Sequence, residues 1–198
     1  MKKKVLLAAI VLSFAAFATG CVPTEDATNV KVNPDFSASQ NIELDFNQLH
    51  NDAIEAMQSI EDGEPFVFIS DLDISGDNSS KTITVRAQSV EGTTQEDCEN
   101  FAAILLTQIN DAAVSQNSNY EVSSPESFGT LYNEYAIDLA VSDENGGTIY
   151  TLSVPAGEDI GLNPDYEQYI EDWKRDLEIY KSNLVYDVSG NVVKNGNE

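Results

Sequence analysis

The sequence predicts an α+β fold in which an antiparallel sheet of two β-hairpins has helices packed on one face. Three stretches carry apolar residues at a helical period, and two stretches alternate apolar and polar residues around glycine-containing turns. Along the chain they follow the order helix, hairpin, helix, hairpin, helix. This is a tandem α-β-β arrangement with a C-terminal helix, and such elements usually form one sheet under one layer of helices.

The first α-β-β unit begins with a helix that we expect to run from Asp45 to Ile60. The first residue is a good N-cap, and Glu61-Asp62-Gly63 places a glycine just beyond the last turn. A hairpin follows over residues 66–88, with its turn at Gly76-Asp77-Asn78-Ser79. One face of this hairpin is apolar, so we expect that face to be buried.

The second unit repeats this order. A capping box at Thr94-Gln95-Glu96-Asp97 starts a helix that we expect to reach Ala113. A loop over residues 115–127 leads to a second hairpin at residues 135–154, whose tight turn is Asn145-Gly146-Gly147. Cys98 lies on the apolar stripe of the helix, and we expect an unreactive thiol in the core.

The third predicted helix starts at Asn163-Pro164 and has an aromatic stripe. Its apolar positions are Tyr166, Tyr169, Ile170, Trp173, Leu177 and Tyr180. Two interpretations remain open. The helical spacing favours a stripe that packs on the core, whereas exposed Trp173 and Tyr169 would form a platform for a sugar or a peptide. A short terminal hairpin is predicted from Val185 to Val193.

The N-terminus has the parts of an export signal. Three lysines precede an apolar run of 14 residues from Val5 to Ala18, which is too short to span a bilayer comfortably. The segment Ala18-Thr19-Gly20-Cys21 resembles the lipobox of bacterial lipoproteins, a family that more often has Leu where Ala18 stands. The resemblance implies cleavage between Gly20 and Cys21 and acylation of Cys21, with palmitate among the acyl chains. Two or three such chains would anchor the protein stably.

The lipobox divides the chain into three predicted parts. They are a signal peptide at residues 1–20, the lipidated cysteine with a flexible tether at residues 21–40, and a single acidic α+β domain at residues 41–198. Loss of the three lysines in residues 1–20 takes the formal net charge from −24 to −27. This charge repels nucleic acid and favours cationic partners or divalent ions. We expect an extracytoplasmic protein held on the cell membrane by its lipid.

The sharpest local motif is Asp71-Leu72-Asp73-Ile74-Ser75-Gly76-Asp77. It resembles the front of a calcium-binding loop, with oxygen ligands at positions one, three and five and glycine at position six. Thr82 stands where that family has its bidentate glutamate, which implies weak affinity. Two interpretations remain open: a loose Ca²⁺ site formed by Asp71, Asp73 and Asp77, or an acidic hairpin tip.

No pattern typical of catalysis stands out. His50 is the only histidine, no G-x-S-x-G motif occurs, and 34 acidic residues make any chosen carboxylate pair uninformative. We therefore expect a non-catalytic binding or interaction module without a cofactor, whose partner is an envelope protein or a glycan. The alternatives are a surface solute- or glycan-binding lipoprotein and a carboxylate-dependent hydrolase.

The tandem layout also resembles exported PepSY-like and β-lactamase-inhibitor-like modules, which bind other proteins. The segment Tyr186-Asp187-Val188-Ser189-Gly190-Asn191-Val192 is similar to the strand-ending motif of PepSY domains. This analogy implies protein binding, but the predicted function rests on the anchor and not on the analogy.

Overall fold

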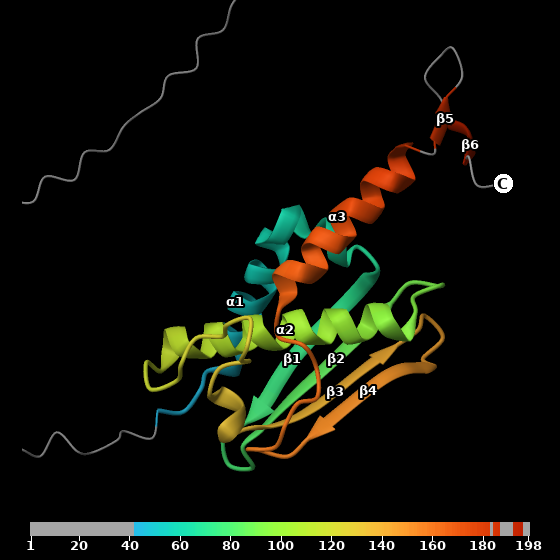
Figure 1. The fold of residues 1–198 in the computed structure, drawn as a ribbon. Helices are drawn as coiled ribbons and strands as arrows, with labels where there is room; N and C mark the ends of the chain where they lie inside the picture. The colour runs from blue at the N-terminus through green and yellow to red at the C-terminus, as the bar shows by residue number, and fades with distance from the viewer. Residues whose placement is uncertain (1–41, 183, 187–191, 196–198) are drawn as a thin grey trace, which may run out of the picture. The chain divides into compact units, whose positions relative to one another are not determined.

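The structure is a computed structural model that describes residues 42–182, 184–186 and 192–195 (Figure 1). The predicted signal peptide, the predicted acylation site at Cys21 and the predicted tether lie outside these residues, as does most of the motif from Tyr186 to Val192. Within the described part the α+β class is confirmed, with three α-helices and a four-stranded sheet. No helix in this part of the chain is long and apolar enough to cross a membrane.

The sheet has the strand order β1-β2-β3-β4. Its strands are β1 (Ile69–Asp77), β2 (Thr82–Ser89), β3 (Ala136–Ser142) and β4 (Thr148–Val154). Both predicted hairpins are confirmed, because β1 pairs antiparallel with β2 and β3 pairs antiparallel with β4. However, β2 and β3 pair in parallel, so the prediction of a purely antiparallel sheet is wrong.

The parallel pair follows from the helix between the two hairpins. Helix α2 (Gln95–Gln116) has 22 residues, a length of about 33 Å at 1.5 Å per residue. It carries the chain back along the sheet to the end where β2 begins, so that β3 sets out in the same direction as β2 (Figure 1). Parallel neighbours require such a crossover.

Helix α2 supplies much of the core. The predicted capping box is confirmed, since the Thr94 side chain accepts from the Asp97 amide and the Asp97 carboxylate accepts from the Thr94 amide. Twelve side chains of α2 are buried, and the inner sheet face adds Ile83, Val85, Ile137, Leu139 and Val141. Cys98 is buried as expected, and its burial raises the pKa of the thiol.

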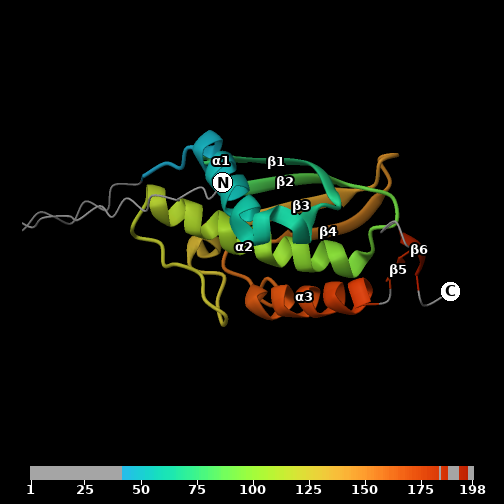
Figure 2. The same cartoon turned by 90° about the horizontal axis from the view of Figure 1, so that it is seen from above.

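Helix α1 (Phe46–Ser59) lies along the β1 edge of the sheet (Figure 2). It starts at Asp45, whose carboxylate accepts from the amides of the second and third residues of the helix. The predicted stop is confirmed, because the backbone of Glu61, Asp62 and Gly63 has positive φ and cannot continue a helix. These residues form a kink within the segment η1 (Ile60–Phe66), which leads into β1.

Helix α3 (Tyr166–Ser182) packs on α2, on the side away from the sheet (Figure 2). The helices therefore do not form the single layer that the sequence suggested. Only Ile170 of α3 is buried, and an ion pair of 2.7 Å joins Lys174 Nζ to Glu61 Oε1 of η1. The short strands β5 (Leu184–Tyr186) and β6 (Val192–Asn195) pair antiparallel, which confirms the terminal hairpin.

Candidate functional site

The residues of the predicted calcium loop form most of β1. Asp71, Asp73 and Asp77 point to the outer face of the sheet, opposite Gln88, Arg86 and Thr82 of β2. A strand rises about 3.3 Å per residue, so the Cα atoms of Asp71 and Asp77 lie about 20 Å apart along β1. Among the described residues, no group of three or more His, Cys, Asp or Glu side chains could hold a metal ion. The structure does not bring the three carboxylates together.

Gly76 of this motif and Asn78, which follows it, have structural roles. Gly76 lies against the ring of Phe46, and a Cβ atom at that position would overlap the ring. The Asn78 amide group donates to Leu44 O at 2.9 Å and accepts from Leu44 N at 3.1 Å, while its oxygen also accepts from Tyr135 Oη at 2.6 Å. The glycine and the asparagine therefore fasten α1 to the hairpin.

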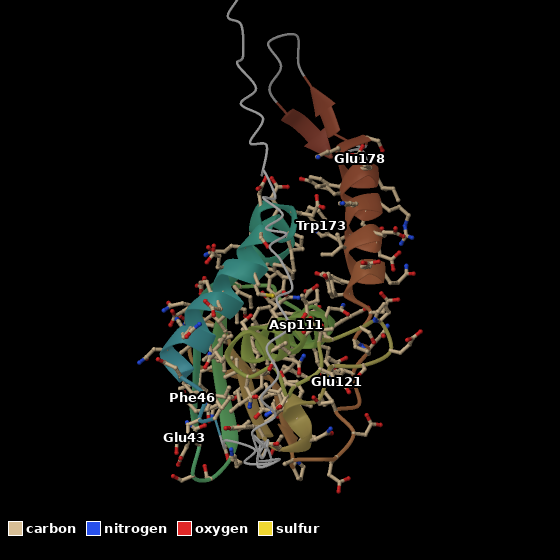
Figure 3. The ribbon with its side chains drawn as sticks, turned by 90° about the vertical axis from the view of Figure 1, so that its left-hand side faces the viewer. Glu43, Phe46, Asp111, Glu121, Trp173 and Glu178 are labelled. Atoms are coloured by element: carbon tan, nitrogen blue, oxygen red, sulfur yellow. The ribbon has the colours of Figure 1, made fainter. Side chains whose placement is uncertain are left out.

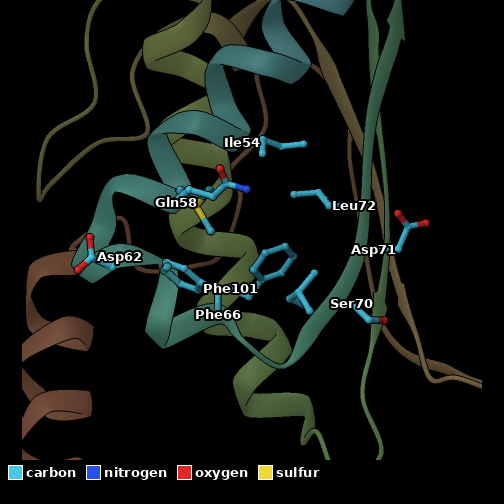
Figure 4. A pocket seen from close by; sticks show the side chains of 11 residues that line it. Ile54, Gln58, Asp62, Phe66, Ser70, Asp71, Leu72 and Phe101 are labelled. Atoms are coloured by element: carbon cyan, nitrogen blue, oxygen red, sulfur yellow. The ribbon is translucent and has the colours of Figure 1, made fainter.

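A groove of about 630 Å³ opens between the C-terminal half of α1, η1 and β1. Its walls and floor are mainly apolar, and they include Ile54, Met57, Phe66, Leu72 and Phe101. Figure 4 shows Ile54 of α1 and Leu72 of β1 directed toward each other across the opening. Asp62 lies at one side of the mouth, whereas Asp71 points away from the groove, toward the outer face of the sheet.

The groove runs beside an edge strand that α1 covers only in part. The Ile74 amide donates to Nδ1 of His50 at 3.1 Å, so this N–H points away from β2. Because successive residues of an antiparallel strand alternate in direction, the Leu72 amide also points away from β2, toward the groove. Phe46 and His50 thus cover the C-terminal half of β1, while the part around Leu72 faces the groove.

A second hollow, of about 620 Å³, lies between α2 and α3. It contains both residues of the predicted platform, Trp173 and Tyr169, together with Tyr166. All three rings are half-buried. Figure 3 shows Trp173 on the side of α3 that faces the rest of the domain. The aromatic stripe therefore neither packs fully in the core nor projects freely into solvent; it lines a cleft.

Acidic groups surround these rings. The cleft is also lined by Glu96, Asp97, Asp165, Asp172 and Asp176, with Arg175 as the cation among the lining residues. Arg175 Nη1 contacts Asp172 Oδ1 at 2.7 Å, and its Nε lies 3.6 Å from Asp176 Oδ1. Burial, with a smaller contribution from the Asp97 charge, raises the pKa of Tyr169.

The groups considered for catalysis are placed apart from one another. His50 accepts the backbone bond of β1, and Cys98 is enclosed in the core. The buried polar side chains of the described residues are Ser89, Thr107, Asn110 and Asn117, and none of them is a carboxylate.

Sequence reasoning missed the groove beside β1. Its lining residues come from α1, η1, β1 and α2, and no short motif links them. The one local signal is the turn at Glu61-Asp62-Gly63, which ends α1 and turns the chain into η1. Comparison of the chain with protein-family models, with curated proteins and with solved structures finds no match.

Proposed function

We propose that this protein is a lipid-anchored, non-catalytic binding module on the extracytoplasmic face of the cell membrane. Its binding site is the groove between α1 and β1, and its partner is an extended segment of an envelope protein. The observation that carries the proposal is an apolar groove beside the part of edge strand β1 that α1 leaves uncovered.

Edge strands present main-chain donors and acceptors that a further strand can pair with. A segment in the groove would meet the main chain of β1 at Leu72 and place alternate side chains between Ile54 and Phe101. Main-chain bonds of this kind provide affinity, and pockets for alternate side chains provide specificity. His50 already satisfies the Ile74 amide, so pairing would stop there.

The test is photocrosslinking in cells with the full-length protein. A benzophenone amino acid replaces Gln58, an exposed residue that lines the groove, or Glu55, an exposed residue of α1 that does not. We expect the probe at position 58 to trap one dominant protein, and the probe at position 55 to trap much less of it.

Cys21→Ala serves as the control for the anchor, and the trapped protein should disappear in that background. Equal crosslinking from both positions, or a product with no protein partner at position 58, would refute the groove as the binding site. Mass spectrometry of the product identifies both the partner and the crosslinked segment.

One observation favours a second candidate, a surface solute- or glycan-binding lipoprotein. Trp173 and Tyr169 line the cleft between α2 and α3, and pockets lined by aromatic rings with a few polar groups commonly bind small molecules.

A further inference from the structure

We infer that the cleft between α2 and α3 binds an organic cation with a primary ammonium group. Three half-buried aromatic rings and an excess of carboxylates line the same 620 Å³ hollow. This inference gives the second candidate above a ligand chemistry, and it does not depend on the groove beside β1, which lies on other elements.

The charge balance of the cleft determines which ligand it favours. Five carboxylates and one guanidinium group line the cleft, and Arg175 is already engaged by Asp172 and Asp176. The residue before Arg175, Lys174, is also a cation. Its Nζ pairs with Glu61 Oε1 at 2.7 Å, and Lys174 is not among the residues that line the cleft. The cleft therefore keeps a net negative charge that a cationic ligand would neutralise.

The aromatic rings add a second attraction for the same chemistry. Trp and Tyr rings attract ammonium groups through their negative faces, and the effect grows as the cation loses water. The rings of Tyr166, Tyr169 and Trp173 lie on successive turns of one helix, so they can line a continuous path along α3. A neutral sugar could contact the rings, but it would gain nothing from the surplus carboxylates.

The test uses Trp173 as its own reporter, because it is the only tryptophan in the chain. The full-length protein in detergent is titrated with spermidine, with glucosamine and with N-acetylglucosamine while tryptophan emission is recorded. Glucosamine and its N-acetyl derivative share a sugar ring and differ in charge. We expect saturable changes with the two amines, weakened by added salt, and none with the neutral sugar.

The amines also separate two sources of the ammonium group. Tighter binding of spermidine identifies a free polyamine as the ligand class, and tighter binding of glucosamine identifies an amino sugar. Equal responses to glucosamine and N-acetylglucosamine would overturn the inference in favour of a neutral glycan. No saturable response to either amine would also overturn it.

A pair of variants removes the same charge inside and outside the cleft. Glu96→Gln neutralises a lining carboxylate, and Glu171→Gln neutralises an exposed carboxylate of α3 that does not line it. We expect the first change to weaken amine binding about fivefold and the second to change it less than twofold. Equal effects would indicate general attraction to an acidic protein and would refute a site. Trp173→Leu, followed by calorimetry, should weaken binding about tenfold.

Discussion

At the scale of single residues, Gly76 is explained by packing. It occupies the position that suggested a calcium loop, but it lies under the ring of Phe46. Gly76→Ala would force a methyl group into that ring, so we expect a loss of about 1–3 kcal/mol in the free energy of unfolding, measured with urea. In a Phe46→Ala background the ring is gone, so the same substitution should cost at least ~1 kcal/mol less. This difference is the coupling energy expected for two residues in contact. An equal cost in both backgrounds would contradict the packing explanation.

The buried phenol of Tyr132 leads to a second prediction, on how the stability of the fold depends on pH. Its hydroxyl donates to Leu106 O at 2.7 Å inside the core, and its burial, with a smaller contribution from Asp111, raises the pKa of the phenol. The unfolded chain ionises near the ordinary value of about 10, whereas the folded chain keeps the proton. Stability is therefore complete below that pH and falls as the pH rises toward the folded pKa.

We expect Tyr132→Phe to cost about 1 kcal/mol at neutral pH, through loss of the hydrogen bond, and to move alkaline unfolding to higher pH. Urea unfolding at neutral pH measures the first effect, and circular dichroism at increasing pH measures the second. Tyr180→Phe is the control, because this ring is exposed and should leave the alkaline midpoint where it is. Identical midpoints for the wild type and Tyr132→Phe would show that another group governs alkaline unfolding.

At the scale of elements, the sequence predicted the features that interactions between neighbouring residues determine. The cap at Asp45, the capping box at Thr94 and both hairpins follow from neighbouring residues, and all are confirmed. The parallel pairing of β2 with β3 depends on where α2 returns the chain. That return is set by long-range packing. A strand with one apolar face can bury that face whether it runs parallel or antiparallel to its neighbour, so the residue pattern does not predict the strand's direction.

The same contrast explains how much of the candidate site was predictable. Trp173 and Tyr169 were found from helical spacing, but their place in a cleft depends on how little of α3 meets α2, where Ile170 alone is buried. The groove could not be found at all, because it arises where α1 and β1 lie beside each other without closing over Leu72. The opening is formed by residues from separate segments, so no single stretch of the sequence predicts it.

The incomplete cover of β1 leads to a prediction about elements. His50→Ala removes the acceptor of the Ile74 amide, so hydrogen exchange at Ile74 should speed up about fivefold, the equivalent of about 1 kcal/mol. The Leu72 amide faces the groove and should exchange quickly in both proteins. Exchange followed by nuclear magnetic resonance measures each amide, with Gln48→Ala on exposed α1 as the control. An unchanged exchange rate at Ile74 in His50→Ala would show that the His50 side chain does not protect this amide.

At the scale of the whole molecule, the acidic composition bears on the proposed anchor. A formal net charge of −24 over the full chain repels anionic lipid headgroups, so the protein cannot rely on electrostatic attraction to stay at a membrane. In the proposed anchoring, acyl chains on Cys21 would supply the attachment that charge cannot. Once attached, the domain would search for partners within the reach of its tether, which raises their effective concentration.

The proposed anchor predicts different behaviour for variants of the two cysteines, Cys21 and Cys98. Wild-type protein should stay in the membrane fraction through washes with high salt, because the proposed acyl chains, unlike charges, would hold it there at any ionic strength. Cys21→Ala should leave that fraction, whereas Cys98→Ala should remain, since Cys98 is a buried core thiol. Cell fractionation with immunoblotting measures the distribution, and mass spectrometry of the N-terminal peptide detects the acyl groups. Retention of Cys21→Ala in the washed membranes would show that something other than the lipid anchors the chain, and the proposed location would then need a different cause.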